Sequence, residues 1–166
     1  MLRANLIAQH ASSMIYVNTP TKRKSMIFDD NRNNYRTFFF SCWQKYREQK
    51  PLEPLEKQLV DIMLYHPEYH DLLTNPEVYL DRDYNSPSIG ETNPFLHLGL
   101  HQALVEQLQT NRPKGITELF QHLVHKTGNT HQAEHQLMDV LMQFIYQNQN
   151  NASVTEQDYL NALAQL

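Results

Sequence analysis

The sequence predicts an all-α protein, a single-domain helical bundle of about six or seven helices. Apolar residues recur at helical spacing through most of the 166 residues, and no segment shows the alternation of apolar and polar residues that is typical of a strand. The chain contains only 4 glycines and 8 prolines, most of them between the periodic segments. Because 40% of its residues are hydrophobic, a chain of this length can bury a core without disulfide bonds.

The first predicted helix carries an aromatic-rich face. Asp29 or Asp30 can cap a helix that runs to about Glu48. Its buried stripe recurs at helical intervals and consists of Tyr35, Phe39, Cys42, Trp43 and Tyr46. We expect this stripe to form core.

A second helix is predicted to start at Pro54 and to end at a histidine. Its apolar face continues to His66, but Pro67 cannot lie deep in a helix, so the chain must break or bend at His66. A short turn then leads through His70 to Leu73.

The middle of the chain combines its longest irregular stretch with its most apolar helix. Residues 75–92 predict a short helical turn followed by a loop. Thr92 or Asn93 then caps a helix with Pro94 at its first position, and this helix runs to about Thr110.

Three further helices complete the prediction. One covers about residues 116–126 and ends at a glycine, and the next, capped by Thr130, continues to about residue 148. Ser153 with Glu156 three residues later resembles a capping box for a last, short helix that ends near Ala164.

Charge separates a basic leader from the rest. The first 28 residues contain four bases and no acid, whereas all 18 acidic residues lie from Asp29 onward. We therefore expect a leader at residues 1–25 and one helical domain at residues 26–166. The leader could be a transit-like address segment, but an upstream start with Met26 opening the domain is the simpler interpretation.

The composition argues against several classes of partner. The acidic domain has no basic stripe for phosphate contacts, which argues against nucleic acid. No apolar run reaches the roughly 20 residues that span a bilayer, so no membrane partner is expected. The single cysteine, Cys42, fits a reducing compartment and excludes a thiolate-rich metal site. We expect a cytoplasmic protein that could form a homo-oligomer.

Histidines form three pairs at a spacing of four residues. Nine histidines would form roughly half of one such pair by chance. The pairs are His66/His70, His97/His101 and His131/His135. On a helix, residues four apart stand above one another, so two imidazoles can bind one ion. His122 and His125 lack this spacing and lie off the apolar positions of their helix.

Two of the pairs continue apolar stripes. The pair at 97 and 101 lines up with Leu104 and Leu108, and the pair at 131 and 135 lines up with Met138, Met142 and Ile145. Buried imidazoles without partners cost about 1–3 kcal/mol each, and a divalent cation would satisfy them. Asp139 and Glu134 lie beside the last pair, and Glu68 beside the first, where a carboxylate can bind the ion or orient a ligand.

Comparison with known metal-binding motifs excludes some classes of metalloprotein but does not identify one. HQAEH, residues 131–135, matches the inverted zinc-protease pattern, in which Glu134 would activate water, but five residues are weak evidence for a peptidase. The Glu-x-x-His spacing of ferritin-like sites does not occur in the chain. A hemerythrin-like or DinB-like bundle is compatible with the spacing.

The segments NPFLHLGLH, HPEYH and AEHQLMD, with PLEPLE and RPKGI, resemble an uncharacterised bacterial family known as domain of unknown function eighteen-forty-one. The resemblance covers about residue 26 to the C-terminus and implies a bacterial cytosolic protein, but no activity. The positions that match are His66, His70, His97, His101, His131, Glu134 and His135.

The sequence thus predicts a metal-binding protein with a buried mono- or dinuclear site for iron, zinc or manganese. The expected ligands are His97, His101, His131 and His135, followed by His66, His70 and Asp139. A redox-active ion would support oxidoreductase chemistry, and zinc would support hydrolysis with Glu134 or Glu68 as base. The alternative is a non-enzymatic interaction or structural module whose histidines form a buried hydrogen-bond network.

Overall fold

The computed structural model describes residues 25–84, 93–150 and 153–166. These residues form eight α-helices and one short 3-10 helix, and the described residues contain no strand. The all-α prediction is therefore confirmed. The predicted leader, apart from Ser25, and loop residues 85–92 lie outside the described residues, and the limits expected for the domain stay a prediction.

The described residues group into two compact units whose boundary falls between Gly99 and Leu100, inside one helix. The N-terminal unit holds residues 25–84 and 93–99 of the described chain, and the C-terminal unit holds residues 100–150 and 153–166. Helix α6 (Pro94–Thr110), which contains this boundary, is continuous.

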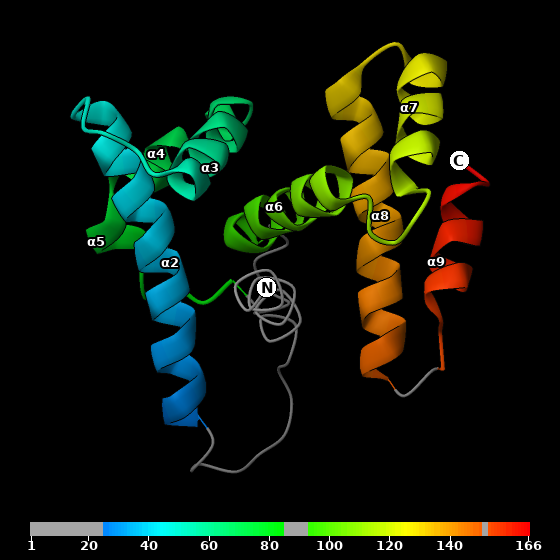
Figure 1. Cartoon of the computed structure of the whole chain (residues 1–166). Coiled ribbons are helices and arrows are strands. Elements are labelled where there is room, and N and C mark those ends of the chain that lie inside the picture. The colour runs from blue at the N-terminus through cyan, green and yellow to red at the C-terminus, as the bar shows by residue number, and fades with distance from the viewer. Residues whose placement is uncertain (1–24, 85–92, 151–152) are drawn as a thin grey trace. The chain divides into compact units, whose positions relative to one another are not determined.

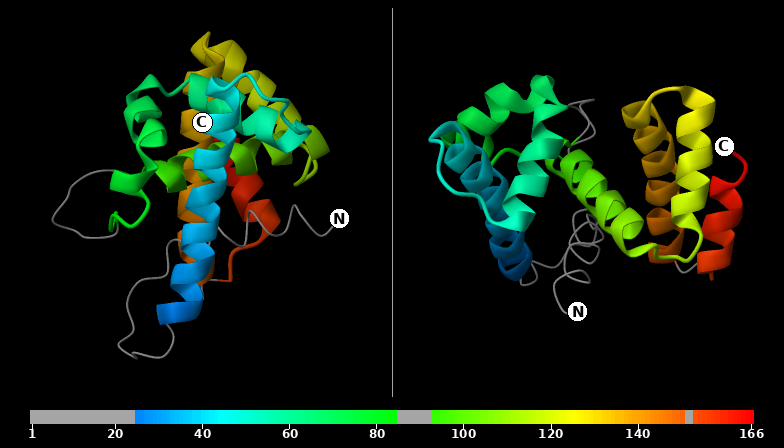
Figure 2. Two further views of the ribbon diagram at one scale, coloured as in Figure 1. Left: turned by 90° about the vertical axis from the view of Figure 1, so that its left-hand side faces the viewer. Right: turned by 45° about the horizontal axis from the view of Figure 1, so that its top comes forward.

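The N-terminal unit is built around α2 (Ser25–Arg47). Helix α2 packs against α3 (Pro54–Leu64) and α4 (His70–Thr74), as Figures 1 and 2 show. Within the predicted aromatic stripe, Phe39, Cys42 and Trp43 are buried, although Tyr46 at its end is exposed. The Trp43 ring packs against His70 of α4, and Phe39 packs against Phe95 of the later helix α6 (Pro94–Thr110). Helix α2 begins at Ser25, earlier than the predicted acidic cap.

Two features confirm the predicted start and end of α3. Pro54 is its first residue, and a capping box joins Glu53 to Glu56. The helix stops at Leu64, as expected from Pro67, and His66 is the N-cap of the 3-10 helix η1 (Pro67–Tyr69). The short α5 (Pro76–Tyr79) follows α4 and corresponds to the predicted helical turn.

Arg36 ties the segment after α5 to α2. Its side chain is fully buried, and Nη1 donates hydrogen bonds to the backbone oxygens of Leu80 (2.6 Å) and Arg82 (2.8 Å). The guanidinium also lies over the rings of Tyr84 and Phe95, at 5.1 and 5.0 Å from their centroids. These contacts hold a charged group in the core by hydrogen bonds and cation–π attraction.

The C-terminal unit consists of the second part of α6 with α7 (Ile116–Thr127), α8 (Thr130–Gln149) and α9 (Glu156–Leu163). Helices α7 and α8 lie side by side and are joined at Gly128, whose positive φ of 68° suits glycine (Figure 1). Helix α9 packs against α8, and its Tyr159 hydroxyl donates to Oε1 of Gln107 on α6 at 3.0 Å. This bond links α9 to α6 within the unit.

Two predicted caps lie one or two residues from the observed ones. Helix α8 is capped by Asn129, whose side chain accepts from the backbone nitrogen of Gln132 at 2.9 Å, and not by Thr130. The capping box of α9 joins Thr155 to Asp158 rather than Ser153 to Glu156. In both places neighbouring polar residues offer alternative caps, and the register of the helix selects one of them.

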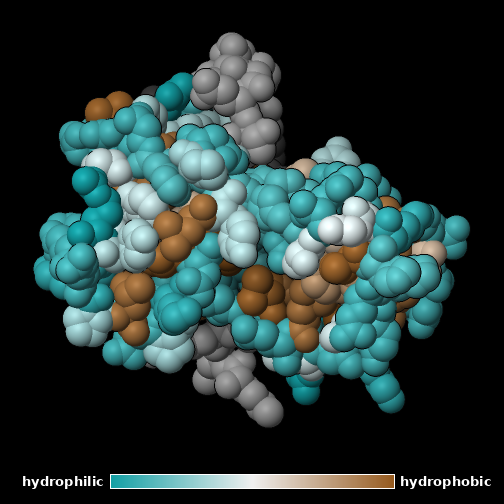
Figure 3. Space-filling model, turned by 90° about the horizontal axis from the view of Figure 1, so that it is seen from above, coloured by the Kyte–Doolittle hydropathy of each residue, from teal (hydrophilic) through white to brown (hydrophobic). Residues whose placement is uncertain are grey.

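The face seen in Figure 3 is mostly hydrophilic, with small hydrophobic groups between the polar residues. Large apolar or aromatic side chains that are exposed include Tyr46, Leu64, Tyr65, Val78, Met142 and Tyr146. Among the described helices, none has the length and apolar content needed to cross a membrane.

Candidate metal centre

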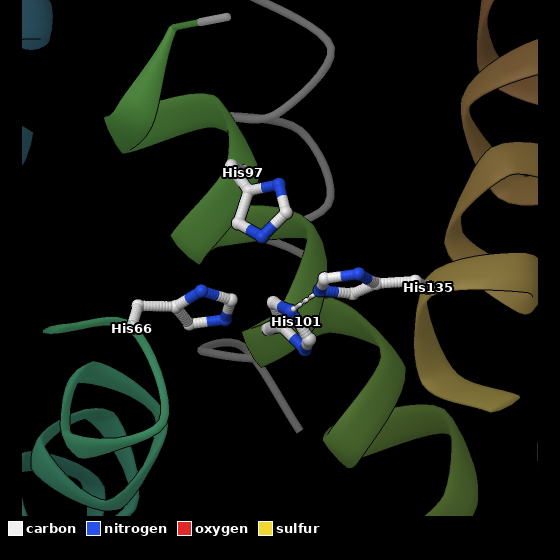
Figure 4. A group of neighbouring side chains, drawn as sticks. All are labelled: His66, His97, His101 and His135. Atoms are coloured by element: carbon white, nitrogen blue, oxygen red, sulfur yellow. Dashed lines mark hydrogen bonds between the residues drawn. The ribbon is translucent and has the colours of Figure 1, made fainter. Parts of the chain in front are cut away.

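Helix α6 carries two histidines one turn apart. The Asn93 side chain accepts from the backbone nitrogens of Phe95 and Leu96 at 3.1 and 3.3 Å, which caps the helix at the predicted place. His97 and His101 therefore follow in consecutive turns (Figure 4). His101 is only 2% exposed, and the predicted companion Leu104 is fully buried, so burial of this helix is confirmed.

Helix α8 presents its donors in its first two turns. Ala133, Leu137 and Leu141 are buried, and they fix the helix in the core of the C-terminal unit. His131, Glu134 and His135 lie beside this apolar strip and are half-buried. The predicted stripe through Met138 and Met142 holds only in part, since Met142 is 38% exposed. Helix α8 contacts α7 and α9, and the buried Ala133, Leu137 and Leu141 lie on a different part of its surface from Met142.

These two helices bring together a set of donors that we call the C-terminal histidine cluster: His101, His131, Glu134 and His135. Nε2 of His135 lies 3.1 Å from Nε2 of His101 (dashed in Figure 4). Oε2 of Glu134 lies 3.4 Å from Nδ1 of His101 and 3.5 Å from Nδ1 of His131. Donor atoms of His101, His131 and Glu134 all lie within 4.8 Å of one another.

The rings in the cluster are in close contact. His101 and His131 are parallel, with centroids 5.3 Å apart. His135 is tilted against both, at 5.0 Å from His101 and 4.3 Å from His131. The pair predicted on α8 and the inner histidine of α6 thus converge in one place.

The separations in the cluster match those between ligands of one ion. Two atoms that each lie about 2.0 to 2.2 Å from an ion, at octahedral or tetrahedral angles, are about 2.8 to 3.5 Å apart. The contacts of Glu134 at 3.4 and 3.5 Å fall in this range. They are longer than a good N–H···O hydrogen bond of at most about 3.2 Å, and a water molecule does not fit between the atoms.

Glu134 is the carboxylate of the cluster. Burial by itself would raise its pKa, but the neighbouring His101 and His131 outweigh that effect and bring the pKa below its ordinary value. Its place near the start of α8 also suits a negative charge. Glu134 is thus available as an anion, the form that binds cations.

A second group lies in the N-terminal unit. His66 is 1% exposed, and its Nδ1 lies 2.9 Å from Oε1 of Glu68. The ring of His97 meets His66 edge to face at 4.7 Å (Figure 4), and Tyr69 stacks on His66 at 5.5 Å. Burial would raise the pKa of Glu68, yet its hydrogen bond to His66 leaves that pKa lowered. A carboxylate that holds one ring nitrogen leaves the other oriented for a ligand.

Five other side chains that could bind a metal lie elsewhere. Nε2 of His70 lies 2.9 Å from the backbone oxygen of Met63, to which it can donate, and its ring packs against Trp43 at 4.5 Å. Asp139 is exposed on α8, and neither residue belongs to a group of donors that the described chain brings together for a metal. Burial raises the pKa of Cys42 to about 12, which keeps the thiol protonated. His122 and His125 are exposed on α7.

The sequence did not single out Tyr69 or the double contact of Glu134. Tyr69, the tyrosine of HPEYH, gives no periodic signal of its own, because it lies in a 3-10 turn rather than on a helix stripe. The contact of Glu134 with both His101 and His131 depends on packing between α6 and α8. The Glu134 of HQAEH was nonetheless a candidate from the motif alone.

By its fold and site, the chain is an all-α protein with a candidate metal centre on two helices. The model of the family "Domain of unknown function (DUF1841)" matches residues 31–165, and the chain belongs to this family. No curated protein and no solved structure matches it significantly. The match confirms the family resemblance and begins five residues after Met26.

Proposed function

We propose that the protein binds a divalent metal ion at the C-terminal histidine cluster. The observation that carries this proposal is the placement of Oε2 of Glu134, 3.4 Å from Nδ1 of His101 and 3.5 Å from Nδ1 of His131. Two nitrogens and one carboxylate oxygen from two helices surround one point at the separations of shared ligands. Water or a further ligand would complete the coordination.

The donor set is of the kind that first-row transition metals bind. Imidazole and carboxylate ligands without thiolate suit iron, zinc and manganese, the ions expected from the sequence. With zinc, a bound water beside Glu134 would give hydrolytic chemistry in which the carboxylate accepts a proton. With iron or manganese, the same ligands would support redox chemistry. His97, His66, His70 and Asp139 as additional ligands stay predictions.

The test compares the metal content of variants that each replace one histidine of the C-terminal unit. His101→Ala and His131→Ala should each lower bound metal at least tenfold in protein dialysed against Zn²⁺ at a concentration that fills only the tightest position of the wild type, because each removes one of three converging donors. His122→Ala, which removes an exposed histidine of α7, is the control. Equal metal content in all three variants and the wild type would contradict the proposal.

One observation favours a second candidate, the interaction or structural module. The rings already have polar partners in the protein: His70 bonds to Met63, His66 to Glu68, and His135 to His101. A network of this kind could stabilise the helices without an ion. Melting with and without chelator separates the two, since a bound ion raises the melting temperature and a hydrogen-bond network is indifferent to chelation.

A further inference from the structure

We infer that His101 bridges two metal positions, one at each of its ring nitrogens. This inference rests on the proposed function, because the first position is the one formed with His131 and Glu134. The second position lies between His101 and His135. It makes the centre of the C-terminal unit dinuclear.

His101 is placed between two different sets of donors. Its Nδ1 faces Oε2 of Glu134 at 3.4 Å, and the same oxygen lies 3.5 Å from His131. Its Nε2 faces Nε2 of His135 at 3.1 Å. The two nitrogens of an imidazole point away from each other, so ligands that meet them bind separate ions.

The separation at the second position also fits coordination. The 3.1 Å between the two Nε2 atoms lies within the about 2.8 to 3.4 Å expected for two nitrogens on one ion. In the absence of metal, the same distance allows one ring to donate its proton to the other. Binding of an ion replaces that shared proton.

The proton balance of the bridge is simple. A neutral imidazole has one lone pair and one N–H, so binding an ion at both nitrogens releases the ring proton to solvent. The imidazolate of His101 and the carboxylate of Glu134 then offset part of the charge of two divalent ions. No electron transfer and no further reactant is needed.

The two positions differ in strength and in the residues they use. The first has two imidazoles and a carboxylate, whereas the second has two imidazoles and must be completed by water. We therefore expect two binding steps, with the first position filling first. His131 belongs only to the first position, His135 only to the second, and His101 to both.

The experiment is a zinc titration of untagged, metal-free protein, with bound Zn²⁺ measured by equilibrium dialysis and elemental analysis. The wild type should bind two ions per chain in two steps. His131→Ala and His135→Ala should each bind one, and His101→Gln should bind neither at zinc concentrations that fill both positions in the wild type. His122→Ala should match the wild type, and circular dichroism checks that each variant is folded.

Other results would overturn the bridge. A wild type that binds a single ion, with His135→Ala unchanged, removes the second position but leaves the proposed function intact. Retention of one ion by folded His101→Gln excludes a shared ligand, and a folded wild type that binds no zinc overturns both proposals.

Copper(II) gives a readout that does not depend on the folding of a variant. Two copper ions on one imidazolate couple their unpaired electrons, so the spin count by electron paramagnetic resonance should fall well below the copper content of doubly loaded wild type. A full spin count would overturn the bridge.

Discussion

At the scale of single residues, Glu134 is central because it contacts two imidazoles of different helices. Glu134→Gln keeps the size of the side chain but removes its charge. We expect the affinity for Zn²⁺ to fall by about 10- to 100-fold, as is usual when a carboxylate that binds or orients metal ligands is replaced.

A competition titration with a chromophoric chelator measures this loss. Glu118→Gln, an exposed glutamate of α7, is the matched control and should bind zinc as the wild type does. Equal affinity in both variants would mean that Glu134 is not part of the centre.

Glu56 is the residue from which we predict a dependence of stability on pH. The carboxylate of Glu56 accepts from Nζ of Lys45 at 2.6 Å and from the backbone nitrogen of Glu53 at 3.0 Å, and these bonds lower its pKa from the ordinary value of 4.5. A carboxyl with a lowered pKa stabilises the fold above its unfolded-state pKa, and this stabilisation is lost as pH falls through the folded-state pKa.

We therefore expect the wild type to lose melting temperature more steeply than Glu56→Gln below about pH 4.5. Thermal melts from about pH 3 to about pH 7 measure the difference in melting temperature between the two proteins. Glu77→Gln, at an exposed position of α5, should follow the wild type. Parallel curves for wild type and Glu56→Gln would contradict the assignment.

Helix periodicity predicted only part of which histidines lie close together in the candidate centre. The spacing of four residues identified His101, His131 and His135, because both helices are continuous. The same spacing grouped His70 with His66, but Pro67 puts a 3-10 turn between them and His70 reaches the backbone of Met63 instead. Spacing predicts convergence only where one helix runs through both residues.

At the scale of elements, α6 depends on a small residue at position 99. A Cβ atom added to Gly99 would lie 2.6 Å from the hydroxyl oxygen of Tyr35 on α2, and 3.6 Å from the nearest ring carbon. The Tyr35 ring packs edge-on against Phe39 at 4.8 Å, which limits its movement. Glycine thus permits this close approach, although it weakens a helix.

This contact predicts a non-additive pair of substitutions. Gly99→Ala should destabilise the protein by about 1–3 kcal/mol through overpacking. In a Tyr35→Phe background the clashing oxygen is gone, so the same change should be neutral or stabilising by up to about 1 kcal/mol. Urea unfolding of the four proteins measures the coupling, and equal effects in both backgrounds would refute it.

Most helix bounds followed from proline and glycine. Pro54, Pro94 and Gly128 stand at the observed ends because they restrict or free the backbone at a single position. Caps were less certain, since Asn129 competes with Thr130 and Thr155 with Ser153. Polar caps are chosen by helix register, which depends on packing.

At the scale of the whole molecule, the chain is all-α, as periodicity predicted, but the division into two compact units was not foreseen. The boundary at Gly99 and Leu100 falls inside an unbroken apolar helix, where no proline, polar run or change in composition marks it. The division depends on contacts between residues far apart in the chain, which local sequence does not report.

The central claim is that this family member binds a metal through the C-terminal histidine cluster. The most direct test is elemental analysis by mass spectrometry of protein purified without a histidine tag or chelator, then exposed to Zn²⁺, Fe²⁺ or Mn²⁺ and dialysed. The account predicts at least one equivalent of one of these ions per chain. A well-folded sample that holds no metal and takes up none of the three would contradict it.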